Sequence, residues 1–152
     1  MHKVIFVCLG NICRSPMAEG LLHQRIKEAQ LESTLQVDSA ATSRWEIGNP
    51  PHPGTQAIFH SKNIAFDSMR ARQITQEDFQ TADVIIGMDR QNVLDLKKIA
   101  PKTAQDKIHL FMSVVPTKET LDIADPYYTG DFEATYEMIT EGLDYWWSYF
   151  LN

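Results

Sequence analysis

The 152-residue sequence contains few cysteines, few basic residues and no long apolar run. Its two cysteines, Cys8 and Cys13, are separated by four residues, which does not match the disulfide framework of a small secreted domain. We therefore expect free thiols in a reducing compartment and a cytoplasmic protein. No stretch approaches the roughly 20 apolar residues that a membrane-spanning helix needs, so no membrane partner is predicted.

Positive charge is also scarce. The sequence has fourteen Lys and Arg residues and twenty Asp and Glu residues, which gives a formal net charge of −6. Since nucleic-acid binding depends on neutralising phosphates with basic side chains, no nucleic-acid partner is predicted. The apolar run at 4–12 is too short for a signal peptide and lacks a small-residue cleavage site. The length and the ordinary globular composition predict a single domain, residues 1–152.

Apolar patterning predicts alternating strands and helices. Short, nearly continuous apolar runs are typical of strands covered on both faces, and they occur at 3–8, 35–41, 82–88 and 107–112. Helical patterns begin near Ser15 or Pro16 and recur at about 52–63, at 89–100 and at 132–150. In the last of these, an aromatic stripe is expected to lie in the core. The alternation predicts a three-layer α/β domain with a parallel sheet flanked by helices, whose ligand crevice lies at the carboxyl ends of the strands.

The segment VCLGNICRSP, residues 7–16, follows the first predicted strand and precedes the first predicted helix. A tight turn that opens a helix directs backbone N–H groups and a partial positive charge at one point, so an oxyanion is the expected ligand. Arg14 could grip that anion with its planar guanidinium. The same field stabilises a thiolate, so Cys8 is predicted to be ionised and to attack phosphorus, forming a phosphocysteine intermediate.

Each of these residues also has a simpler interpretation. Cys8 could be the buried last residue of a strand, but Gly10, Asn11 and the Ser15-Pro16 pair at a strand-to-helix junction favour the functional interpretation. Asn11 could hold the loop through side-chain hydrogen bonds or supply a left-handed turn residue, or both. Ser15 could cap the helix or donate a hydrogen bond to the thiolate.

Hydrolysis of a phosphocysteine also needs an acid for the leaving oxygen and then a base for water. The candidate is Asp125 in the segment IADPYYTGD, where Tyr127 and Tyr128 suggest a wall for a flat aryl group. Taken alone, Asp-Pro is a turn signal, and the two tyrosines could pack against the last helix.

Together, VCLGNICRSP and DPYY resemble the low molecular weight protein tyrosine phosphatase family. The similarity extends through VDSAATSRWEIGNPPHPG and RARQITQEDF and covers residues 3–151. It implies a four-stranded parallel sheet, a Cys8 nucleophile, transition-state binding by Arg14 and a general acid at Asp125. The implied phosphate-binding loop follows strand one and consists of Cys8, Leu9, Gly10, Asn11, Ile12, Cys13, Arg14 and Ser15.

The resemblance also implies supporting and substrate-contacting residues. Asn11, Ser15 and Ser39 would support the loop, and the substrate pocket would be lined by Leu9, Ile12, Trp45, Glu46, Tyr127 and Tyr128. The implied activity is hydrolysis of phosphotyrosine-containing proteins and aryl phosphates without a cofactor or metal, inhibited by phosphate-like oxyanions. Some members have a histidine near the position of Met69, so contacts there are expected to differ.

Other functions fit these residues less well. Arsenate reductases of the same fold relay oxidation through later cysteines, whereas no cysteine follows Cys13. A non-catalytic phosphotyrosine-binding module would be expected to lack Cys8 or Asp125. A zinc site lacks a second ligand pair, and a papain-like protease signature is absent. Cys13 itself could simply pack in the loop or could form a reversible disulfide with Cys8.

Overall fold

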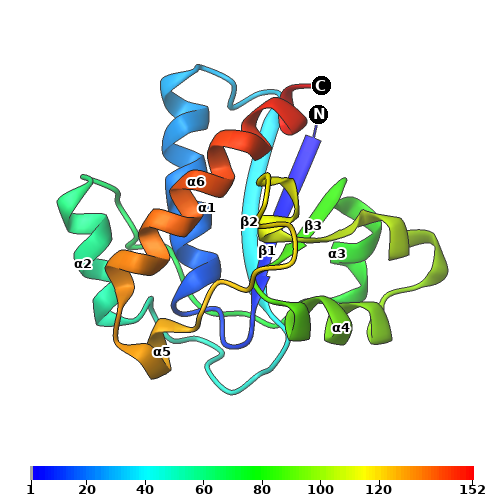
Figure 1. Ribbon diagram of the computed structural model, residues 1–152, viewed down its shortest axis with the longest axis horizontal. Helices are drawn as coiled ribbons and strands as arrows, with labels where there is room; N and C mark the ends of the chain where they lie inside the picture. Colours follow the sequence, from blue (N-terminus) through cyan, green and yellow to red (C-terminus); the bar gives the residue numbers. More distant parts are fainter. Residues whose placement is uncertain (1) are drawn as a thin grey trace.

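The computed structural model describes residues 2–152; Met1, which the predicted domain includes, lies outside the described residues (Figure 1). Four strands form one parallel sheet in the order β2-β1-β3-β4. The strands are β1 (His2–Cys8), β2 (Leu35–Ala41), β3 (Val84–Gly87) and β4 (Ile108–Leu110). The predicted three-layer α/β fold with a four-stranded parallel sheet is therefore confirmed. Within residues 2–152, no helix combines the length and the apolar character needed to cross a bilayer.

Strand β1 lies inside the sheet because its side chains are apolar on both faces. Val4 and Phe6 belong to one buried cluster, whereas Ile5 and Val7 belong to another. Helices α1 (Arg14–Glu28) and α6 (Phe132–Leu151) cover the first face, and α2 (Pro53–Ser61) packs beside them. Helices α3 (Gln76–Thr81) and α4 (Arg90–Ile99) cover the second face (Figure 1). The sheet is thus shielded on both sides, as its continuous apolar strands predicted.

The aromatic stripe of α6 is core, as predicted. Trp146 and Phe150 stack with ring centroids 5.6 Å apart, and both are buried with Ile139 and Leu143. The buried indole N–H of Trp146 donates a hydrogen bond to the carbonyl of Phe111 at 2.7 Å. This bond satisfies the one polar group of the indole and fixes the last helix to the end of the sheet.

Several boundaries differ from the predicted ones. The strand expected at 107–112 spans only Ile108–Leu110, between the 3₁₀ helices η1 (Lys102–Lys107) and η2 (Phe111–Val114). It is an edge strand that pairs with β3 alone, and the chain leaves the sheet where the Phe111 ring enters the core. Helix α1 begins at Arg14, slightly earlier than expected, and β3 is shorter than 82–88.

Two short helices were not predicted. Helix α3 has six residues, too few for an apolar period, and begins with a reciprocal capping box between Thr75 and Asp78. Helix α5 (Pro126–Thr129) is a single turn that begins after Asp125 and ends at Gly130, whose φ of 74° is left-handed. The Asp-Pro turn signal therefore marks the start of a helical turn.

Gly142 of α6 is required for close packing against Phe111. A Cβ atom at position 142 would overlap the Phe111 ring, which is fully buried. We expect Gly142→Ala to lower the free energy of unfolding by about 1–2 kcal/mol, because overpacking outweighs the helix propensity gained. Denaturant unfolding measures this change.

The matched control is Ser148→Ala on an exposed position of the same helix. It should change the free energy of unfolding by less than about 0.5 kcal/mol. A Gly142→Ala protein more stable than wild type would contradict the packing described here.

Candidate active site

The loop between β1 and α1 closes at the carboxyl edge of the sheet, and Asn11 fixes its curvature. Asn11 has a left-handed φ of 59°, which Asn tolerates better than most residues. Its side-chain Nδ2 donates to Ser15 Oγ at 2.8 Å and to Ser39 Oγ at 2.9 Å. Its Oδ1 accepts a hydrogen bond from the backbone N–H of Arg72 at 3.1 Å. Both interpretations of Asn11 therefore hold at once.

Cys8 lies at the base of this loop with its sulfur held by two polar neighbours. The backbone N–H of Asn11 lies 3.3 Å from Sγ, and Ser15 Oγ lies 3.1 Å from it. Ser15 accepts a hydrogen bond from Asn11, so its own proton can point at the sulfur or at the more distant carbonyl of Ala40, 3.5 Å away. Ser15 does not cap α1: the cap position is Cys13, which makes no side-chain capping bond.

Arg14 is almost completely buried, at 2% exposure, and its charge is balanced by two carboxylates. Nη1 donates to Asp89 Oδ2 at 2.7 Å and to the carbonyl of Ile123 at 2.9 Å, and Nη2 lies 3.4 Å from Asp125 Oδ2. Burial lowers the pKa of Arg14, but the negative charge of Cys8 and the bond to Asp89 together raise it above its ordinary value. The buried Nε has no hydrogen-bond partner among residues 2–152 and remains an available donor.

Asp89 is a functional residue that sequence reasoning missed. It caps α4, because its Oδ1 accepts the backbone N–H of Asn92 at 2.7 Å. Its Oδ2 accepts a hydrogen bond from Arg14, which lies 75 positions earlier in the sequence. The available signal was its place two residues after β3, where side chains reach the same edge of the sheet as the loop.

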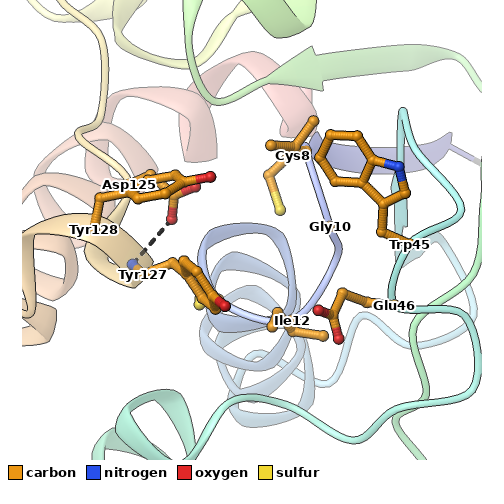
Figure 2. Close-up of a pocket in the computed structure, with 10 residues that line it drawn as sticks. Cys8, Gly10, Ile12, Trp45, Glu46, Asp125, Tyr127 and Tyr128 are labelled. Atoms are coloured by element: carbon orange, nitrogen blue, oxygen red, sulfur yellow. Dashed lines mark hydrogen bonds between the residues drawn. The ribbon is translucent and has the colours of Figure 1, made fainter.

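Asp125 faces the same pocket as Cys8 (Figure 2). Its Oδ1 accepts the backbone N–H of Tyr127 at 3.1 Å, which orients the carboxylate at the start of α5. The pocket has a volume of about 140 Å³. All six predicted substrate-contacting residues line it, together with the loop and the acid: Cys8, Leu9, Gly10, Ile12, Cys13, Trp45, Glu46, Asp125, Tyr127 and Tyr128.

Aromatic side chains stand around the mouth of this pocket. Trp45 is 75% exposed and Tyr128 is 74% exposed, on opposite sides of Cys8 in Figure 2. Tyr127 packs edge-on against Tyr128 and against His52, which steadies its ring. A flat aryl group entering between these side chains would bring its terminal oxygen down toward Cys8.

Cys13 is buried against Ile12 and Ala71. Burial, reinforced by the negative charges of Cys8 and Asp125, raises the pKa of the Cys13 thiol to about 12. Both cysteines are free thiols in the structure. The packing interpretation of Cys13 therefore accounts for its position, while a disulfide with Cys8 stays a prediction.

A second cavity, of about 240 Å³, lies behind the loop, and Met69 is one of the residues that line it. Ser39 Oγ donates to Glu19 Oε1 at 2.5 Å, so a mostly buried carboxyl is connected through Ser39 to Asn11. Burial raises the pKa of Glu19 to about 7, despite the opposing hydrogen bond from Ser39. Glu19 was not singled out from the sequence, where it is one of two acids on α1.

No three or more His, Cys, Asp or Glu side chains within residues 2–152 are grouped so that they could hold a metal ion. The chemical groups assembled at the site are a thiol, a buried guanidinium, a carboxyl and a turn of backbone N–H groups. This combination suits displacement at a bound oxyanion.

Comparison with known proteins identifies relatives that match nearly the whole chain. Residues 3–150 match the family model described as low molecular weight phosphotyrosine protein phosphatase. The low molecular weight protein-tyrosine-phosphatase YfkJ of Bacillus subtilis is 42% identical over 95% of this chain and 92% of its own length. The phosphatase PtpA of Staphylococcus aureus is 41% identical over 95% of this chain and 90% of its own.

Solved structures give the same relationship. The crystal structure of YfkJ from Bacillus subtilis has a TM-score of 0.95 at 40% identity, covering 99% of this chain and 95% of that one. A Drosophila arginine phosphatase, DARP, has a TM-score of 0.90 at 33% identity, covering 99% and 98% of the two chains.

The mostly buried Glu19 makes stability depend on pH. A carboxyl whose pKa rises from 4.5 to about 7 on folding opposes folding when it ionises. The stabilising effect of its neutral form is complete below pH 4.5 and is lost as the pH rises through 7. We expect Glu19→Gln, which can still accept from Ser39, to gain stability over wild type between pH 5 and pH 8. The gain should reach at most roughly 3 kcal/mol.

Unfolding at several pH values measures this difference. Glu28→Gln, an exposed acid on the same helix, serves as the control and should show no such trend. A stability difference between Glu19→Gln and wild type that stays constant with pH would contradict the assignment.

Proposed function

The chain belongs to the low molecular weight phosphotyrosine protein phosphatase family, and from this membership we propose that Cys8, Arg14 and Asp125 carry out its reaction. The protein is a protein tyrosine phosphatase, a cysteine-dependent phosphomonoester hydrolase that acts on phosphoproteins. The observation that carries the assignment of residues is that a thiol and a carboxyl face one pocket, while a buried guanidinium contacts the same carboxyl at 3.4 Å.

In the first step, the Cys8 thiolate attacks the phosphorus of a bound aryl phosphate. A sulfur–phosphorus bond forms as the bond between phosphorus and the phenolic oxygen breaks. Asp125, in its acid form, protonates the departing oxygen. The loop N–H groups and Arg14, including its unused Nε, hold the three equatorial oxygens as charge develops on them.

In the second step, water attacks the phosphocysteine and Asp125, now a carboxylate, accepts its proton. Phosphate forms and Cys8 leaves as a thiolate. The hydroxyl of Ser15 and the backbone N–H of Asn11 lie where they stabilise the departing sulfur. Each step therefore leaves Asp125 in the protonation state that the next step needs.

The two carboxylates near Arg14 have different surroundings, which supports Asp125 as the acid. Both oxygens of Asp89 are engaged, one by Asn92 and one by Arg14 at 2.7 Å. Asp125 makes the longer contact with Arg14, 3.4 Å, and faces the pocket. We therefore assign Asp89 a positioning role for the guanidinium and proton transfer to Asp125.

Substrate preference follows from the depth of the site. Cys8 is 3% exposed, at the bottom of a pocket with aromatic walls at its mouth. A phosphotyrosine side chain is long and flat enough to reach the sulfur between Trp45 and Tyr128, whereas phosphoserine and phosphothreonine are shorter. The proposed substrates are phosphotyrosine-containing proteins and small aryl phosphates, with phosphate-like oxyanions as inhibitors.

We also propose that residues 1–152 form one phosphatase domain acting in the cytoplasm without a cofactor. The alternatives have less support. Arsenate reduction through a cysteine relay lacks a cysteine after Cys13, and a binding module without catalysis leaves the pairing of Cys8 with Asp125 unexplained.

The test of the proposed function is hydrolysis of phosphotyrosine peptides in the presence of EDTA. Wild type should cleave them in preference to phosphoserine peptides. Cys8→Ser should lose at least roughly a thousandfold in kcat, because a hydroxyl replaces the nucleophile. Phosphate release measures the rate, and a thermal shift with phosphate checks that the variant still folds and binds the anion.

Full activity in Cys8→Ser would overturn the phosphocysteine scheme. Equal cleavage of phosphoserine peptides would contradict the role of the pocket walls. Because one structural relative is named an arginine phosphatase, phosphoarginine peptides belong in the same assay, and faster cleavage of these would reassign the substrate. Arsenate reduction, assayed in parallel, should be absent.

The role of Asp125 has a separate signature. Asp125→Ala should lower kcat by roughly 10²–10⁴-fold for aryl phosphates whose phenols are poor leaving groups. The loss should shrink for nitrophenols, which leave without protonation. A series of substituted phenyl phosphates measures this dependence in both proteins. An identical dependence on the leaving group in wild type and Asp125→Ala would point to a different acid.

A further inference from the structure

A second hollow lies directly beside the active-site pocket, and the two share Leu9 and Trp45 in their linings. Its volume is about 370 Å³. Beyond the shared residues, it is lined by Thr42 and Ser43, which follow β2, and by Asp95, Lys98 and Ile99 of α4. We call it the Ile99 groove. Trp45 therefore separates two adjoining depressions, and only one of them holds the reacting groups.

The groove exposes large apolar side chains. Ile99 is 46% exposed at the end of α4, and Trp45 is 75% exposed on the other side. Apolar side chains that stay in water beside a binding pocket gain free energy when a ligand covers them. The charged residues of the groove, Asp95 and Lys98, have opposite signs, so the groove favours neither an acidic nor a basic ligand strongly.

The position of the groove indicates what would occupy it. When a phosphotyrosine side chain reaches Cys8, the residues before and after it must cross the mouth of the pocket. An extended chain advances about 3.3–3.6 Å per residue, so side chains within a few positions lie on the surrounding surface. The groove begins on the far side of Trp45, with Leu9 continuing from one depression into the other.

We propose that the Ile99 groove binds an apolar side chain of the substrate protein, within a few residues of the phosphotyrosine. This inference rests on the proposed function of the neighbouring pocket. The enzyme then distinguishes among phosphotyrosine sites by flanking sequence, and an apolar residue in the correct position raises kcat/KM. Small aryl phosphates, which have no flanking residues, do not use the groove.

The test is a set of phosphotyrosine peptides in which one leucine is moved through the positions flanking the phosphotyrosine, with asparagine as its polar counterpart. In wild type, leucine at one or two of these positions should raise kcat/KM by about tenfold. Ile99→Ser should abolish most of that preference. Leu94→Ser is the matched control, because Leu94 is 56% exposed on the same helix but does not line the groove.

Hydrolysis of p-nitrophenyl phosphate separates this proposal from the proposed function. Both serine variants should hydrolyse it at the wild-type rate. If they do, and the leucine preference is absent in wild type or survives in Ile99→Ser, the groove proposal is overturned while the catalytic assignment stands. Failure of wild type to hydrolyse either p-nitrophenyl phosphate or the peptides would instead overturn the proposed function. Equal loss of the preference in Leu94→Ser would also count against a specific role for Ile99.

Discussion

The buried charge of Arg14 is the constraint on which the site depends. A guanidinium with 2% exposure is destabilising by several kcal/mol unless anions and hydrogen-bond acceptors surround it. Here the partners come from two places in the chain: Asp89 at the start of α4, and the segment just before α5, which supplies the Ile123 carbonyl and the Asp125 carboxylate. Neutralising this one side chain therefore brings the ends of distant elements to the carboxyl edge of the sheet.

The same arrangement leaves Arg14 suited to bind an anion. Its Nη1 is committed to protein acceptors, which fixes the plane of the guanidinium, while its Nε has no partner within residues 2–152. The loop beside it is closed by Asn11 in a left-handed conformation, so the backbone N–H groups follow the same curve. Since the donors are positioned before substrate arrives, little reorganisation is needed when charge develops on the phosphoryl oxygens.

The sequence was most informative where structure is decided locally. The β1–loop–α1 unit was predictable from an apolar run, a glycine and a proline within one short segment. The aromatic face of α6 was predictable from the spacing of its apolar residues. The Arg14–Asp89 bond spans 75 positions and the Glu19–Ser39 bond spans 20, and neither side chain of either pair identifies its partner by spacing. The shortening of β4 likewise depends on Phe111 meeting Gly142, a contact between residues 31 positions apart. The spacing of residues in the sequence therefore did not predict the long-range pairing of polar groups in the site.

These long-range bonds also set the direction of the hydrogen bonds that reach the nucleophile. Glu19 accepts from Ser39, and Ser39 accepts from the Asn11 amide, whose oxygen is in turn held by the backbone N–H of Arg72. With the amide fixed in this orientation, its Nδ2 must also donate to Ser15. Ser15 then has one proton left, and its two possible acceptors are the sulfur of Cys8 at 3.1 Å and the more distant carbonyl of Ala40 at 3.5 Å. The far side of the loop thus leaves the Ser15 hydroxyl as a donor within reach of the Cys8 sulfur, where it would stabilise the sulfur that departs when the phosphocysteine is cleaved.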